Sequence, residues 1–132
     1  MKTTINKEIN ISGNCLMGGF ETNVEIKPSS TKGIRFYHKN NDKNDYINAC
    51  LGNVISTVHC TVLGNNGNHV KVVEHFLAAC AFTGIDSLDV FIDNNEMPIL
   101  DGSALKWVEL FKESGINNAK NNNDSLEIND SI

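Results

Sequence analysis

The chain has 132 residues, a formal net charge of -5 and 40% hydrophobic residues, values that fit one compact domain with a buried core. Its 11 Lys and Arg residues are scattered, which disfavours a nucleic-acid-binding surface. No apolar run approaches the roughly 18 residues that cross a bilayer, and the polar opening MKTTINKEINI does not resemble a signal peptide. The four cysteines contain no C-x-x-C pair, which favours reduced thiols. We therefore expect a cytoplasmic protein without a transmembrane segment.

Three segments near the start of the chain carry apolar residues along one side and polar residues along the other. They are TINKEINIS (4–12), TNVEIK (22–27) and GIRFYHK (33–39). A period of two residues is typical of strands, because successive side chains point to opposite faces of a sheet. These segments predict a half-exposed antiparallel sheet.

A hairpin and a helix are predicted next. The turn sequence GNNGN (64–68) separates the apolar segments STVHCTVL and HVKVV, which indicates a β-hairpin. The period then changes to helical spacing, with Gly84 as the stop signal. The residues in this spacing are Val73, Phe76, Leu77, Cys80, Ala81 and Gly84.

A further strand and a second helix follow. SLDVFID (87–93) alternates in polarity, and ALKWVELFKESG (104–115) returns to helical spacing. Asp101 or Ser103 is placed to cap the first turn of this helix. The predicted core stripe consists of Leu105, Val108 and Phe111, widened by Trp107 and Leu110.

The order of these elements predicts an α+β fold. We expect a single two-layer domain over residues 1–116, with a mainly antiparallel sheet and two principal helices packed on one face. Residues 117–132, NNAKNNNDSLEINDSI, are rich in Asn and poor in large apolar side chains. That composition is typical of a disordered tail.

Glu74 and His75 stand side by side at the start of the first predicted helix. Adjacent helical residues point about 100° apart, so both cannot face the core, but in the first turn both can face a cleft. In a structural interpretation, Glu74 favours the positive end of the helix and His75 is a hydrogen-bonded surface residue. In a catalytic interpretation, His75 binds a metal ion and Glu74 is a base toward water. The pair alone leaves both open.

The motifs around this pair carry a family resemblance. VEHFLAACAFTGIDSLDVFID (73–93) and EMPILDGSA (96–104) resemble the first domain of the UDP-3-O-acyl-N-acetylglucosamine deacetylases (LpxC), the zinc amidases of lipid A synthesis. The family pattern there is V-E-H, an Ala/Leu-rich helix, G-[IL]-D, a strand, and E-I-P-I-[ML]-D-G-S. The resemblance extends over nearly all of residues 3–116, and GNCLMG (13–18) is a further match.

The resemblance implies a reaction and a set of site residues. The reaction is hydrolysis of the 2-acetamido group of a UDP-linked acylated glucosamine, with release of acetate. Glu74 matches the family's general base and His75 matches a Zn²⁺ ligand. Leu16 matches a leucine beside the acyl-chain passage, and Thr57 and Val58 match apolar positions that face the substrate.

Three positions depart from the family pattern. Met17 replaces a His, Val72 replaces a small hydroxyl residue, and His59 stands where a cysteine near the zinc is common. His59 is therefore an additional candidate metal ligand, if its strand runs beside the start of the helix. Cys60 would face the opposite side of that strand.

The family's remaining catalytic groups lie on a second domain, which carries an H-K-x-x-D zinc-binding motif. One imidazole cannot hold a catalytic zinc ion, so we expect this chain to be inactive without that domain. A separate second-domain subunit would also cover the apolar helix face. The alternative is a non-catalytic remnant or a metal- or ligand-binding module that self-associates as a homodimer. A truncated product without an independent role is the third interpretation.

Overall fold

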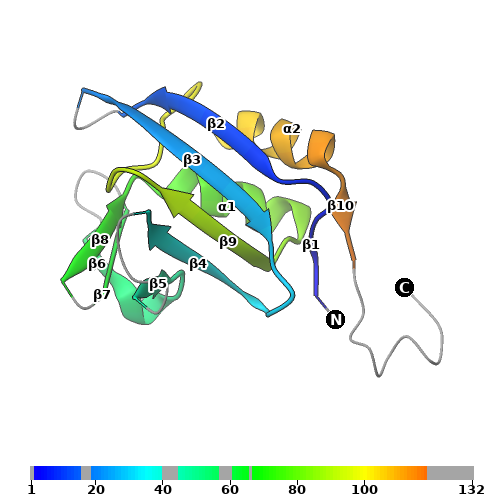
Figure 1. Ribbon diagram of the computed structural model, residues 1–132, viewed down its shortest axis with the longest axis horizontal. Coiled ribbons are helices and arrows are strands. Elements are labelled where there is room, and N and C mark those ends of the chain that lie inside the picture. The colour runs from blue at the N-terminus through cyan, green and yellow to red at the C-terminus, as the bar shows by residue number, and fades with distance from the viewer. Residues whose placement is uncertain (1, 16–18, 40–44, 57–60, 66, 119–132) are drawn as a thin grey trace.

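The computed structural model describes residues 2–15, 19–39, 45–56, 61–65 and 67–118 (Figure 1). One layer is a five-stranded sheet with the order β2-β3-β9-β4-β5. All neighbouring strands run antiparallel except β4 and β9, which are parallel. The strands are β2 (Ile9–Asn14), β3 (Glu21–Pro28), β4 (Gly33–His38), β5 (Tyr46–Asn48) and β9 (Ser87–Ile92).

The predicted alternation gives this sheet its buried face. Val24 and Ile26 of β3 are buried, as are Val90 and Ile92 of β9. β3 and β9 pair with Val24 opposite Ile92 and Ile26 opposite Val90. Because residues opposite each other share a face, the four side chains form one apolar surface toward the helices.

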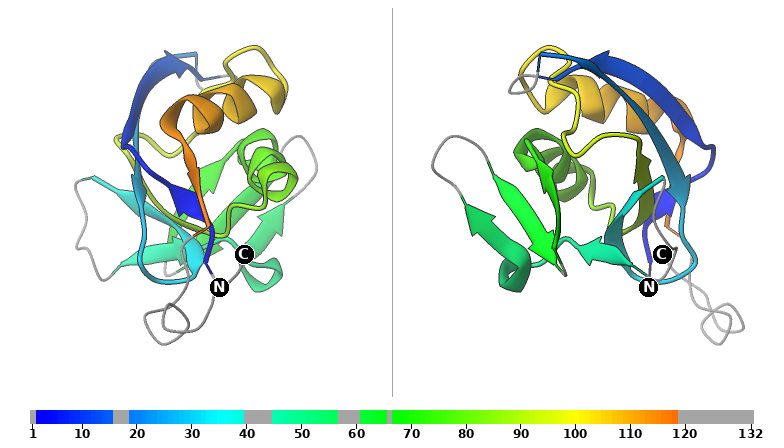
Figure 2. Two further views of the ribbon diagram at one scale, coloured as in Figure 1. Left: turned by 90° about the vertical axis from the view of Figure 1, so that its right-hand side faces the viewer. Right: turned by 60° about the vertical axis from the view of Figure 1, so that its left-hand side comes forward.

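Helices α1 (Glu74–Thr83) and α2 (Leu105–Ser114) cover that face (Figure 1, Figure 2). They meet at Phe76 of α1, whose ring centroid lies 5.1 Å from Trp107 and 5.8 Å from Phe111 of α2. The same ring lies 5.8 Å from Phe36 of the sheet. These edge-to-face contacts join both helices to the strands, and the predicted α+β arrangement with two helices on one face is confirmed.

Helix α2 differs from the prediction at its first residue. Val108 and Phe111 are buried as predicted, but Leu105 is 61% exposed. Trp107 is buried instead, against Phe76. Residues two positions apart on a helix point about 200° apart, so the core cannot hold both Leu105 and Trp107. The larger ring occupies it.

Two smaller sheets flank the main one. A three-stranded sheet follows the 3-10 helix η1, and β7 and β8 form the predicted hairpin, with Leu63 opposite Val70. Lys71, the last residue of β8, donates its N–H to the carbonyl of Asn95 (2.8 Å) and accepts from the N–H of Met97 (3.0 Å). The hairpin is therefore anchored directly before α1. These elements are η1 (Leu51–Asn53), β6 (Val54–Ser56), β7 (Val62–Asn65) and β8 (Asn68–Lys71), with β1 (Thr4–Ile5) paired to β10 (Ile116–Asn117).

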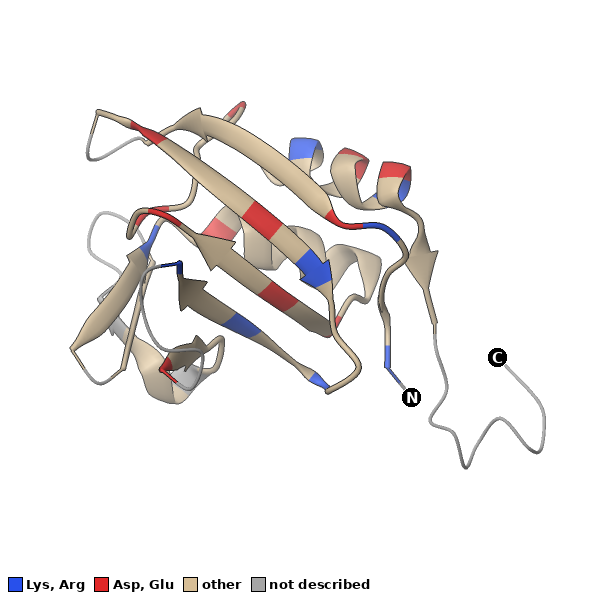
Figure 3. Ribbon diagram, viewed as in Figure 1, with Lys and Arg blue, Asp and Glu red and all other residues tan. Residues whose placement is uncertain are grey.

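Charged residues of both signs are interspersed on the outer face of the main sheet (Figure 3). Arg35 Nε lies 2.8 Å from a carboxylate oxygen of Asp89 on the neighbouring strand. In the described ranges, no helix has the length and apolar character needed to cross a membrane. Of the predicted tail, Asn117 belongs to β10, and residues 119–132 lie outside the described residues.

Candidate active site at the start of helix α1

A sharp turn between β8 and α1 presents the two residues singled out by the sequence. Val72 has a φ of 59°, in the left-handed region that β-branched residues rarely adopt. Its side chain is 2% exposed, and Val73, the N-cap residue, is also buried. The two buried valines leave the next positions near the surface, where Glu74 and His75 are half-buried.

The carboxylate of Glu74 is held by the main chain of Thr61, the residue before β7. The N–H of Thr61 donates to Oε1 of Glu74 at 3.2 Å. The carbonyl of Thr61 accepts from the N–H of Val72 (3.0 Å) and of Val73 (3.5 Å). No hydrogen bond to another described residue involves Oε2 of Glu74.

His75 occupies the next helical position, about 100° around the axis from Glu74. Its imidazole makes no hydrogen bond or ion pair with the rest of the described chain. In the structural interpretation this ring is a hydrogen-bonded surface group, but no described residue is its hydrogen-bonding partner.

The other predicted site residues, Leu16, Thr57, Val58 and His59, lie outside the described residues. Cys15, the described residue that precedes Leu16, is buried. Its thiol lies 3.8 Å from the carbonyl oxygen of Glu96. Burial, followed by the charges of Glu96 and Asp93, raises the pKa of the Cys15 thiol to about 11.

The described residues by themselves do not fit a zinc ion. Nowhere among them do three or more His, Cys, Asp or Glu side chains gather to hold a metal. His75 offers one imidazole, whereas a catalytic zinc ion takes three protein ligands. Further ligands would have to come from outside the described part of the chain.

Comparison with known proteins tests the family resemblance. The family model of LpxC, UDP-3-O-acyl N-acetylglycosamine deacetylase, matches residues 2–132. This chain belongs to the LpxC family. The predicted family membership is thereby confirmed.

Curated LpxC relatives carry the name UDP-3-O-acyl-N-acetylglucosamine deacetylase. The relative from a Nitratiruptor species is 35% identical over 130 residues, which are 98% of this chain and 43% of the relative. The relative from Oleidesulfovibrio alaskensis is 39% identical over 116 residues, which are 87% of this chain and 38% of the relative. This chain thus spans about two fifths of the length of the curated relatives it matches.

Several apolar residues on the two helices are exposed. Phe82 of α1 is 77% exposed, and Leu105 at the start of α2 is also exposed. Ala78 and Ala81 on α1 are exposed as well. Large exposed apolar side chains are one feature of protein–protein contacts. We call Ala78, Ala81, Phe82 and Leu105 the helix surface.

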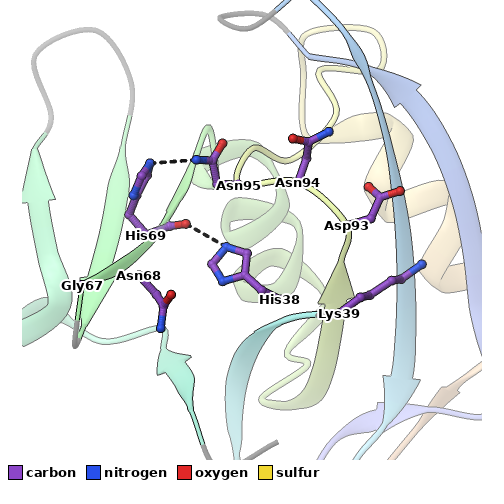
Figure 4. Close-up of a pocket in the computed structure, with 8 residues that line it drawn as sticks. All are labelled: His38, Lys39, Gly67, Asn68, His69, Asp93, Asn94 and Asn95. Atoms are coloured by element: carbon purple, nitrogen blue, oxygen red, sulfur yellow. Dashed lines mark hydrogen bonds between the residues drawn. The ribbon is translucent and has the colours of Figure 1, made fainter. Parts of the chain in front are cut away.

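A polar pocket of about 370 Å³ lies between β8, the end of β4 and the loop after β9 (Figure 4). Nε2 of His38 donates to the carbonyl oxygen of His69 (3.0 Å), and the side-chain amide of Asn95 donates to Nε2 of His69 (3.1 Å). Burial, followed by the charges of Lys71 and His38, lowers the pKa of His69, which keeps the ring neutral at neutral pH. These hydrogen bonds join the hairpin to the main sheet. Sequence analysis missed this junction, because its residues come from three separate segments.

Proposed function

We propose that this chain is the first domain of a zinc-dependent UDP-3-O-acyl-N-acetylglucosamine deacetylase that acts in the cytoplasm, in lipid A biosynthesis. The position of Glu74 and His75 carries the proposal, because these consecutive residues of the V-E-H motif are half-buried in the first turn of α1. Family membership supports the reaction class, hydrolysis of the 2-acetamido group of a UDP-linked acylated glucosamine. Activity of a whole enzyme is part of the proposal, since the relatives are much longer than the region matched.

In the proposed reaction Glu74 is the general base. Its carboxylate takes a proton from water as the water attacks the amide carbonyl. One carboxylate oxygen is bonded to Thr61, which leaves the other to receive the proton. His75 contributes one ligand to Zn²⁺, which when bound supplies Lewis acidity. The other ligands would come from a second domain with the H-K-x-x-D motif.

Four residues outside the described part of the chain complete this proposal. Leu16, Thr57 and Val58 would contact the acylated glucosamine, as the family motif implies. His59 would be an additional metal ligand. Cys15 and Thr61, which flank these segments in sequence, are described. Thr61 contacts Glu74 directly.

The helix surface supports a partner that covers it. Phe82 of α1 and Leu105 of α2 expose large apolar side chains. We propose that a second LpxC domain, on the same or a separate polypeptide, packs there and brings its zinc ligands to His75. Burial of such a surface contributes roughly 25 cal/mol per Å² of apolar area.

Reconstitution tests the proposed function. The chain is combined with a polypeptide that carries the second domain, and bound zinc and acetate released from UDP-3-O-acyl-N-acetylglucosamine are measured. We expect stoichiometric zinc and turnover only in the combined sample. Glu74→Ala should reduce turnover by roughly 10²–10⁴-fold, the contribution of a general base. His75→Ala should remove the zinc.

Glu113→Ala is the matched control, because Glu113 is an exposed carboxylate on α2. It should leave both turnover and zinc content unchanged. Unchanged turnover in Glu74→Ala would show that Glu74 is not the base. Failure of the combined sample to bind zinc would overturn the assignment of His75.

A non-catalytic, self-associating module is the second candidate. The observation in its favour is that the described part of the chain holds no group of three or more metal-binding side chains, while Phe82 and Leu105 are exposed. Two copies related by a two-fold axis would cover each other's helix surface. Light scattering of the purified chain would then give a dimer mass, and Phe82→Glu would give a monomer. A monomeric wild-type chain excludes this candidate.

A further inference from the structure

We propose that Thr61 and Val72 are positioning residues, which hold the carboxylate of Glu74 in the orientation that accepts the proton. This inference rests on the proposed function of Glu74 and extends it to two residues that the sequence motif does not mark as functional. Neither residue would touch the substrate. Both act through the main chain, Thr61 as a hydrogen-bonding partner and Val72 as the site of a sharp turn.

Thr61 contacts both the side chain of Glu74 and the backbone that precedes it. Its N–H donates to Oε1 of Glu74 (3.2 Å), while its carbonyl accepts from the N–H of Val72 (3.0 Å) and of Val73 (3.5 Å). A hydrogen bond to a carboxylate is charge-assisted and stronger than one between neutral groups. One residue therefore fixes the direction of α1 at its first turn and the rotation of the carboxylate.

Val72 supplies the turn that brings Glu74 to Thr61. Its φ of 59° is unfavourable for a β-branched residue and persists only where the surroundings impose it. The surroundings here are its buried side chain and its hydrogen bond to Thr61. On the other side, Lys71 is bonded to Asn95 and Met97. The turn is thus held from both ends.

Amide hydrogen exchange of the chain tests this contact without any need for activity. The Thr61 amide should be protected in the wild type and in Glu74→Gln, whose side-chain oxygen still accepts a hydrogen bond. In Glu74→Ala it should exchange roughly tenfold faster, which corresponds to the loss of a hydrogen bond to a charged group. Its amide proton resonance should move upfield in Glu74→Ala only. Equal exchange in all three proteins would overturn the proposal.

Kinetics of the reconstituted deacetylase test positioning. Thr61→Pro removes the N–H, so kcat should fall roughly 10–100-fold with KM unchanged, as expected for a misplaced base. Thr61→Ala keeps the amide and should match the wild type. An unchanged kcat in a folded Thr61→Pro, or equal losses in both variants, would contradict positioning by this amide. If Glu74→Ala is fully active, the proposed role of Glu74 as the base fails. The hydrogen-exchange experiment then still shows whether Thr61 is bonded to Glu74.

Discussion

The starts of helices α1 and α2 are alike in backbone and different in how they are stabilised. Each follows a non-glycine residue with positive φ, Val72 at 59° and Leu100 at 53°. At α2 the stabilising contacts are local: Asp101 Oδ1 accepts from the N–H (3.0 Å) and the hydroxyl (2.9 Å) of Ser103. The Ser103 hydroxyl oxygen in turn accepts from the N–H of Leu105 (3.3 Å).

At α1 no side chain caps the helix. Val73 is the N-cap residue and its side chain cannot accept a hydrogen bond, and Glu74 is bonded instead to Thr61, thirteen positions earlier in the chain. The N-cap residue of α2, Ala104, makes no side-chain cap bond either, but Ser103 before it bonds to the first helical N–H. The two helix starts therefore differ in the range of their contacts. Those of α2 stay within a few residues, whereas Glu74 contacts a residue of a distant segment.

The largest expected effect comes from removing the ring that both helices share. Phe76→Ala should lower the free energy of unfolding by about 3–5 kcal/mol, because this buried ring contacts Trp107 and Phe111. Phe82→Ala is the matched control on the same helix and should change it by less than about 0.5 kcal/mol, since Phe82 is exposed. Urea denaturation measures both. Equal losses would show that the helix surface is part of the core.

Removing the Ser103 hydroxyl should affect α2 by an intermediate amount. Ser103→Ala deletes the oxygen that accepts from the N–H of Leu105, and we expect a loss of about 1 kcal/mol in urea denaturation. Ser30→Ala, at an exposed serine between β3 and β4, should have little effect. A Ser103→Ala protein as stable as the wild type would remove the contrast between the two helix starts.

Sequence reasoning recovered what depends on local pattern. The alternation around Val24 and Ile26, the hairpin and the first helix were predicted correctly, because periodicity follows directly from burial of one face. Within that helix Ala81, which the predicted spacing included, is exposed. The parallel pairing of β4 with β9 was missed, since alternation does not encode strand direction. The bond from Thr61 to Glu74 was missed because a main-chain donor leaves no residue signature.

A smaller effect is expected from the strained turns. Val72→Gly and Val72→Ala both remove the buried side chain, but only Gly adopts positive φ without strain. We expect the Gly variant to be the more stable by about 0.5 kcal/mol. Leu100→Gly and Leu100→Ala should differ in the same direction. Val70 lies within β8 and has no positive φ. There the Ala variant should be more stable than the Gly variant. If the Gly variant were the more stable one at Val70 as well as at Val72, backbone strain would not explain the difference at Val72.

The smallest expected effect is a pH dependence confined to the start of α2. Hydrogen bonds from Ser103 lower the pKa of Asp101 below its ordinary value of 3.8. A carboxylate whose pKa is lower in the folded state stabilises that state above the unfolded pKa and loses the contribution as pH falls through the folded pKa. Asp101→Asn keeps the side-chain oxygen but has no charge to lose. The wild type should therefore exceed Asp101→Asn in free energy of unfolding at neutral pH, and the gap should close on acidification below pH 3.8.

Two other carboxylates, Asp86 and Asp93, also make the free energy of unfolding depend on pH. Burial alone would raise the pKa values of Asp86 and Asp93, but hydrogen bonds outweigh it and both values are lowered. Their contribution to acid sensitivity is common to the wild type and to Asp101→Asn, so it cancels in the difference between the two proteins. A gap that stays constant with pH in urea denaturation would therefore show that the Asp101 charge does not support this helix start.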